Sequence, residues 1–322
     1  TWRAEPPMTP LHPGDQLDHY RLEELAARSG MASIFRATDL RSGAQVAVKV
    51  PHPEAECDVV FYERFQREAQ IGQEMDHPAV MKVLASENQA RVYMVMEWVE
   101  GRLLREILAE QGPLPPERAL SIAFSVCDAL DHIHGRGVIH RDLKPENIMV
   151  TAGDQIKLID FGIARKEGAR RLTFGKLSYV MGTAEYISPE QVRGKRGDAR
   201  CDIYALGVML YEMLTGTTPF RGANPLAVMN ARLHGDPVPP RSLKPDLSPQ
   251  LEEILLLALE RDPRNRYAAA RDLAGDLRRP GWVRRAARPA PQPLPKRVLF
   301  YSTLAAIPAT ILALLLYVAR HQ

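Results

Sequence analysis

The sequence predicts an α+β fold in two unequal parts, followed by a C-terminal helix long enough to cross a membrane. Three observations support this prediction. Before residue 100 apolar residues alternate with polar ones, after it they recur at three- and four-residue spacing, and residues 298–319 carry no charge. A composition of 45% hydrophobic and 25% charged residues over 322 positions is typical of a globular protein.

The first part of the sequence is predicted to form a small sheet that carries one helix. Proline and polar residues over 1–17 indicate a disordered linker, so we expect order from about residue 18. Strand patterns cover 34–37, 46–50 and 91–97, and one helical pattern covers 61–75.

The second part, 101–282, is predicted to be mostly helical. Helical patterns occur over 116–134, 202–215, 225–234 and 250–259. Prolines and arginines without apolar periodicity then indicate a linker over 283–297, so the folded domain is expected to end near Trp282.

The run 298–319 is predicted to be a transmembrane helix, because at about 1.5 Å per residue it spans the ~30 Å bilayer core. The alternative is a buried C-terminal helix of the globular domain. Lys296 and Arg297 precede the run and only Arg320 and His321 follow it, so the positive-inside bias predicts a single-pass inner-membrane protein with its folded domain in the cytoplasm.

Charge and cysteine content argue against a nucleic-acid-binding protein, a disulfide framework and a zinc site. The net charge of +3 is small, and the basic excess lies near the C-terminus, so no nucleic-acid partner is expected. Cys57, Cys127 and Cys201 are far apart and odd in number, which favours reduced thiols over a disulfide framework or zinc site. The chain begins at Thr1 without a signal peptide, and we expect it to be a piece of a longer protein.

The most informative segment is HRDLKPEN at 140–147, followed by Asp160, Phe161 and Gly162. It resembles the catalytic loop and DFG motif of protein kinases, which implies a two-lobed fold with an N-lobe at 18–100 and a C-lobe at 101–282. The resemblance implies that Asp142 orients the substrate hydroxyl with Lys144 beside it. Asn147 and Asp160 would bind the Mg²⁺ or Mn²⁺ that bridges the phosphates of ATP.

Further nucleotide-binding residues follow from the same resemblance. Lys49 in VAVKV looks like the lysine that holds the α- and β-phosphates, and Glu68 falls where its ion-pair partner is found. Met96 resembles the residue before the hinge that meets adenine. The other implied nucleotide contacts are Ile34, Ala47, Glu97, Val99, Glu100 and Met149.

The phosphate-covering loop departs from the family pattern. Ala27, Ser29 and Ala32 stand at its three glycine positions, while Gly30 remains. Glycine there lets the backbone approach phosphate without a Cβ atom, so we expect reduced affinity or rate. Small alanine and serine side chains keep a close approach available.

The substrate class and the activation segment are also implied. Lys144 to Glu146 and Thr183 are similar to serine/threonine enzymes, and GTAEYISPEQ resembles bacterial membrane-anchored serine/threonine kinases. Asp202 and Gly207 would support the catalytic loop, and Arg266 would pair with Glu190. Arg141 would bind a phosphate on the segment, with two candidate acceptors, Thr173 and Ser178.

Three alternatives stay open. A membrane-anchored pseudokinase scaffold is favoured only by the altered glycine loop. A small-molecule phosphotransferase would share the broad fold, but enzymes of that class lack the KPE and SPE features of this sequence. A receptor kinase is disfavoured because few residues follow the span. The expected partners are protein substrates with Ser or Thr, the lipid bilayer and, left open, a second copy in a homodimer.

Overall fold

The computed structural model describes residues 10–29, 31–53, 59–84, 91–160, 165–166 and 185–280. The chain divides into two compact units, 1–283 and 284–322, and every described residue belongs to the first. Several predicted features lie outside the described residues: Gly30, Phe161, Gly162, Thr173, Ser178, Gly182, Thr183, the linker 283–297 and the span 298–319.

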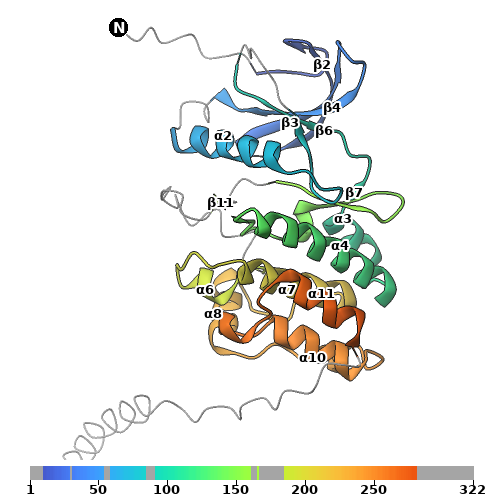
Figure 1. Cartoon of the computed structure of the whole chain (residues 1–322), viewed down its shortest axis with the longest axis vertical. Helices are drawn as coiled ribbons and strands as arrows, with labels where there is room; N and C mark the ends of the chain where they lie inside the picture. Colours follow the sequence, from blue (N-terminus) through green and yellow to red (C-terminus); the bar gives the residue numbers. More distant parts are fainter. Residues whose placement is uncertain are drawn as a thin grey trace, which may run out of the picture. The chain divides into compact units, whose positions relative to one another are not determined.

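The N-terminal part is a six-stranded antiparallel sheet with one helix on it (Figure 1). The strand order is β1-β2-β3-β4-β6-β5, with β4 and its lysine inside the sheet. The elements are β1 (Gln16–Leu17), β2 (Tyr20–Arg28), β3 (Ala32–Asp39), β4 (Gln45–Pro51), helix α2 (Val59–Glu74), β5 (Val83–Leu84) and β6 (Met94–Glu97).

The two faces of this sheet bury separate clusters because side chains alternate along a strand. In β4, Val46, Val48 and Val50 enter one cluster with Phe35. Ala47 lies on the opposite face, in a second cluster that includes Met94, Met96 and Phe65 of α2. Helix α2 therefore covers the face that Lys49 shares with Ala47.

The C-terminal part is mainly helical, with a core that surrounds α7. The sequence of α7 is apolar on nearly every side, which fits a helix buried all round. Its helices are α3 (Leu104–Gln111), α4 (Pro116–Gly135), α6 (Pro189–Val192), α7 (Arg200–Thr215), α8 (Pro225–His234), α9 (Pro240–Leu243), α10 (Pro249–Ala258) and α11 (Ala270–Arg278).

The C-terminal part also contains short strands and 3₁₀ turns between its helices. One small sheet has the order β10-β9-β7, and a further pair joins β8 to β11. The elements are β7 (Arg102–Leu103), β8 (Val138–Ile139), the 3₁₀ turn η1 (Pro145–Asn147), β9 (Ile148–Val150), β10 (Ile156–Leu158), β11 (Arg165–Lys166) and the 3₁₀ turn η3 (Pro263–Asn265).

Ordered structure begins before the predicted boundary at residue 18. Leu17 is buried and pairs with Tyr20, and the amide of Gly14 donates to the carbonyl of Leu22 at 2.8 Å. A positive φ of 51° at Asp18 makes the tight turn between β1 and β2. The disordered-linker interpretation of 10–17 is thus wrong, because Leu17 supplies apolar surface to the sheet core.

The helices α3 and α11 were not predicted, although α11 has apolar residues at helical spacing, namely Ala270, Leu273, Ala274 and Leu277. Among the described residues no helix has the length and hydropathy needed to cross a membrane. The predicted span 298–319 lies outside the described residues.

Candidate active site

The predicted ion pair between Lys49 and Glu68 is present. Nζ of Lys49 lies 2.6 Å from Oε1 of Glu68, and both side chains are largely buried. Lys49 follows Ala47 by two residues and Glu68 follows Phe65 by three, so strand and helix periodicity bring both charges to the same sheet–helix interface. The pair is therefore set by the packing of α2 on β4.

Burial controls the protonation of this pair. Removal from water raises the pKa of Glu68 to about 7 against the opposing effect of Lys49, and Asp160 adds to the rise. A glutamate that titrates near neutral pH makes the charge of the pair sensitive to pH.

Asp160 approaches the same lysine from the C-terminal part, with Oδ1 3.8 Å from Nζ of Lys49. The amide of Leu158 donates to Ala79 and its carbonyl accepts from Met81, which attaches β10 to the chain that follows α2. The φ of Asp160 is +68°, an uncommon conformation for a residue other than glycine. Its side chain remains partly exposed, so its oxygens can reach a ligand.

The catalytic-loop residues converge on Asp142. Nζ of Lys144 donates to Oδ2 of Asp142 at 2.7 Å, and Nδ2 of Asn147 donates to the Asp142 carbonyl at 2.7 Å. The other carboxylate oxygen, Oδ1, is buried and accepts no hydrogen bond from the described part of the chain. Burial raises the pKa of Asp142 although Lys144 opposes the rise. Oδ1 is thus the available proton acceptor in this loop.

Asp202 of α7 holds the loop in place, as predicted. Its carboxylate is fully buried and accepts from the amides of His140 at 2.9 Å and Arg141 at 2.7 Å. His134 supplies a third bond, at 2.8 Å from its Nε2. Burial opposes ionisation of Asp202, but the bond from His134 and the nearby charges hold its pKa below the ordinary value. Arg141 has φ +67°, which turns the chain into the loop.

Two of the predicted nucleotide contacts, Ile34 and Ala47, lie on the helix-covered face of the sheet. Ile34 stands opposite Lys49, and Ala47 stands opposite Met96 in the strand register. Met149 lies in β9, paired with Lys157 of β10. The predicted nucleotide contacts therefore come from both parts of the domain, as the predicted boundary near residue 100 implies.

The hinge residue Glu97 makes contacts that the sequence did not indicate. Its carboxylate accepts from Nζ of Lys157 at 2.6 Å and from the amide of Lys82 at 2.8 Å, and its own amide donates to the Lys82 carbonyl. This residue therefore joins β6 to β10. Val99 and Glu100 follow β6 after one intervening residue, Trp98.

The altered phosphate loop is held by its serine. The hydroxyl oxygen of Ser29 accepts from the amides of Met31 at 3.3 Å and Ala32 at 3.0 Å and donates to the Ala32 carbonyl. Ala27 and Ile34 are paired on the flanking strands. Two amides of the expected phosphate-binding loop thus already have an acceptor within the loop, a contact that the sequence did not indicate.

Asn147 and Asp160 fit a hard metal ion. With Nδ2 of Asn147 committed to the Asp142 carbonyl, its Oδ1 is the remaining polar atom, and Asp160 offers a partly exposed carboxylate. Within the described ranges no three His, Cys, Asp or Glu side chains gather closely enough to hold a metal. Mg²⁺ suits such a site because it commonly takes one or two protein oxygens plus phosphate and water.

The second predicted ion pair, between Glu190 and Arg266, is confirmed. Nη1 and Nη2 of Arg266 donate to the two carboxylate oxygens of Glu190 at 2.8 and 2.7 Å, and both residues are buried. Burial opposes the ionised form of Glu190, but Arg266 holds its pKa below the ordinary value. Gly207 of α7 lies close to α10, since a Cβ atom there would lie 2.9 Å from the Cβ of Ala258.

A four-residue cluster beside the catalytic loop was missed. Arg105 of α3 contacts Glu146 of η1, Glu212 of α7 and Tyr186 of the segment before α6. The residues are up to 107 positions apart, so no local pattern could indicate the contact.

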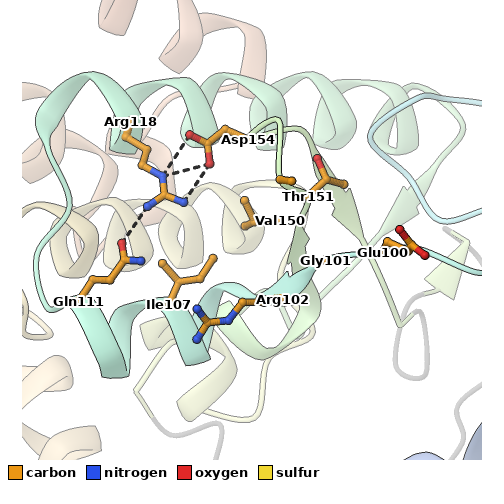
Figure 2. Close-up of a pocket in the computed structure, with 10 residues that line it drawn as sticks. Glu100, Gly101, Arg102, Ile107, Gln111, Arg118, Val150, Thr151 and Asp154 are labelled. Atoms are coloured by element: carbon orange, nitrogen blue, oxygen red, sulfur yellow. Dashed lines mark hydrogen bonds and ion pairs between the residues drawn. The ribbon is translucent and has the colours of Figure 1, made fainter. Parts of the chain in front are cut away.

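A cavity of about 420 Å³ lies beside the hinge (Figure 2), and neither Lys49 nor Asp142 is among its lining residues. Arg118 on its wall donates to both carboxylate oxygens of Asp154 and to Gln111. Arg102 pairs with Glu110. Arg102, Arg118 and Asp154 thus have partners in or next to the wall, and Glu100, one of the predicted nucleotide contacts, also lines the cavity.

The comparisons with known proteins agree with this geometry. The protein kinase domain family matches residues 23–276. The serine/threonine-protein kinase PknB of Mycolicibacterium smegmatis is 42% identical over 274 residues, which cover 84% of this chain and 43% of that protein. PknB of Mycobacterium leprae is 41% identical with the same coverage.

A solved kinase-domain structure is similar in fold to this chain. The kinase domain of PknI from Mycobacterium tuberculosis has a TM-score of 0.64 and 26% identity, and the match covers 84% of this chain and 100% of that domain. The chain spans less than half the length of the curated relatives it matches. With the ion pair, the catalytic loop and the fold in agreement with these matches, the chain belongs to the protein kinase domain family, in its bacterial serine/threonine branch.

Proposed function

We propose that the protein is a serine/threonine protein kinase that transfers the γ-phosphoryl group of ATP to protein hydroxyls. The observation that carries this proposal is the convergence of Lys49, Glu68 and Asp160 in one domain with Asp142, whose Oδ1 accepts no hydrogen bond from the described residues. The serine/threonine specificity rests on the names of the similar proteins and on the KPE residues after Asp142.

Each residue has a defined part in the transfer. Lys49 would bind the α- and β-phosphates, and Glu68 would keep the ammonium group in position. Oδ1 of Asp142 would accept the hydroxyl proton as the hydroxyl oxygen bonds to the γ-phosphorus and the bond from that phosphorus to the bridging oxygen of ADP breaks. Lys144 would balance the negative charge nearby. Asn147 and Asp160 would hold Mg²⁺, which when bound neutralises phosphate charge.

The proposal includes anchoring by 298–319, with the domain on the cytoplasmic side of the inner membrane. Its support is the uncharged length of this run and the basic residues before it. Alkaline carbonate extraction of membranes should leave the full chain in the pellet. Release of the full chain into the supernatant would contradict anchoring.

Autophosphorylation on Thr173 or Ser178 is the second finer proposal. Arg141 supports it, because its Nε is buried and has no hydrogen-bond partner among the described residues, as expected for a group that awaits phosphate. Replacing both acceptors with alanine should lower activity. Full activity of the double variant would exclude this role.

The main test measures transfer from γ-labelled ATP with Mg²⁺ by the full chain, onto itself and onto a basic protein. Asp142→Asn should lower kcat by about 10²–10⁴-fold, because the proton acceptor is removed. Asp246→Asn, at an exposed site, is the matched control and should retain activity. Equal activity of Asp142→Asn and wild type would rule out the proposed base, and no transfer by the wild type would favour a scaffold without catalysis.

A further inference from the structure

Arg105 lies between two carboxylates beside the catalytic loop. Its Nε donates to Oε1 of Glu146 at 3.1 Å, and its Nη1 donates to Oε1 of Glu212 at 2.8 Å. Its Nη2 donates to the hydroxyl of Tyr186, which in turn donates to Oε2 of Glu212 at 2.5 Å. A single guanidinium group therefore serves acceptors on η1, α7 and the segment before α6.

The charges of this cluster do not cancel. Two carboxylates face one guanidinium, so a negative charge remains. Glu212 is the buried end, with a side chain 10% exposed, whereas Arg105 at 30% and Glu146 at 38% face solvent. Oε2 of Glu146 is buried and has no hydrogen-bond partner within the described ranges. The cluster is acidic and partly exposed to solvent, and the guanidinium of Arg105 already lies between its two carboxylates.

The position of the cluster relates it to a substrate peptide. Glu146 precedes Asn147, which is bonded to the Asp142 carbonyl. Tyr186 lies two residues before Ser188, whose hydroxyl donates to Gln191, and Gln191 donates to the Arg141 carbonyl. A peptide that presents its hydroxyl to Asp142 would place its neighbouring residues close to this acidic group.

We infer that Arg105 is a specificity-determining residue: its guanidinium fills, from within the chain, an acidic subsite of Glu146 and Glu212 that would otherwise select a basic side chain near the acceptor hydroxyl. This inference rests on the proposed function. The wild-type enzyme then discriminates little between substrates with and without arginine at that place. An arginine is well suited to this role because its planar donors can serve several acceptors at once.

A purely structural role for Arg105 makes a different prediction. If the residue only ties α3 to α7, its removal would lower stability and activity for all peptides alike. If it also fills a subsite, its removal would change the ratio between peptides. The ratio is therefore the quantity to measure.

The test uses the full chain and peptides with one threonine, in which a single arginine or a glutamine occupies each neighbouring position in turn. In the wild type the ratio of kcat/KM for arginine over glutamine peptides should stay near one. In Arg105→Ala it should rise at least about tenfold at one position, with KM for ATP nearly unchanged. Adding Glu146→Gln to that variant should return the ratio toward one.

Two further variants make the result specific. Arg118→Ala removes another arginine that binds a carboxylate in the C-terminal part (Figure 2), and it should leave the ratio near one. Arg105→Met keeps much of the apolar stem, so it covers the case in which Arg105→Ala does not fold. An unchanged ratio in a folded Arg105 variant, or a wild type that already prefers arginine, would overturn the inference.

A binding measurement separates this inference from the proposed function. If the wild type phosphorylates no peptide, calorimetric titration of Arg105→Met with the same peptides still decides between the two roles. About tenfold tighter binding of one arginine peptide than of its glutamine partner would support the filled subsite. Equal affinities at every position would reject it, whatever the catalytic result.

Discussion

The two loops expected to meet ATP are built in different ways. The catalytic loop at 140–147 is attached to the C-terminal core, since buried Asp202 accepts from two of its amides and Asn147 binds the Asp142 carbonyl. The loop between β2 and β3 is exposed at Arg28 and Ser29, and among its described residues the side-chain hydrogen bonds involve the Ser29 hydroxyl. The catalytic loop keeps every family residue that we identified, whereas the phosphate loop has lost three glycines.

The difference shows where substitution is tolerated. A change in the catalytic loop or in Asp202 leaves buried donors without acceptors, and each such donor costs roughly 1–3 kcal/mol. A change in the phosphate loop leaves groups that water can reach, so its cost in stability is small. The first loop is therefore constrained by folding as well as by chemistry, and the second by ligand binding alone.

The largest combined effect on activity and stability is expected from Asp202→Ala, which removes the acceptor for His140, Arg141 and His134. Activity should fall by at least about 100-fold, with a loss of stability of about 3 kcal/mol or more. Phosphate transfer and denaturant unfolding of the same preparation measure both effects. Asp246→Ala is the control, and a fully active, stable Asp202→Ala would show that the loop holds its position without α7.

An intermediate effect should come from pH, through Glu68. Its pKa of about 7 means that acid protonates the partner of Lys49, so kcat/KM for ATP should rise up to about tenfold from pH 6 to pH 8. Glu68→Gln should remove the part of this rise that Glu68 causes. A rise of the same size in Glu68→Gln would assign it to another group, such as Asp142 with its raised pKa.

The pH dependence of folding stability that Glu68 causes should have the opposite sign to the pH dependence of activity. The raised pKa means that folded protein holds the proton of Glu68 more tightly than unfolded protein, whose value is near 4.5. Between about pH 4.5 and 7 the contribution of Glu68 to stability therefore falls as pH rises. Thermal unfolding of wild type and Glu68→Gln across this window would show the difference, and parallel curves would contradict it.

The smallest expected effect is in the phosphate loop. Ser29→Ala frees the amides of Met31 and Ala32 from their internal acceptor, and a neutral hydrogen bond of about 0.5–1.5 kcal/mol corresponds to a few-fold change. ATP should bind roughly threefold more tightly, as measured by calorimetry. Ser33→Ala, whose hydroxyl instead contacts His52, is the matched control. Weaker binding by Ser29→Ala would show that the serine organises the loop for phosphate.

Much of the fold could be predicted because its helices and strands have clear periodicity. The patterns at 116–134 and 225–234 correspond closely to α4 and α8, and the strand at 46–50 lies within β4. The order of 10–17 was missed, because proline and polar residues resemble a linker until Leu17 packs into the sheet core. The short helix α3 was missed because eight residues carry little periodic signal.

The sequence by itself determined the family and the identity of the chemical groups, because HRDLKPEN, Lys49 and Asp160 are recognised from residue type and spacing along the chain. Only the tertiary structure decided which charges meet. Glu68 reaches Lys49 through the packing of α2, Ser29 binds its own loop, and Arg105 lies between two carboxylates from distant segments. Such contacts depend on distances in space between residues far apart in the chain, and residue order alone does not contain those distances.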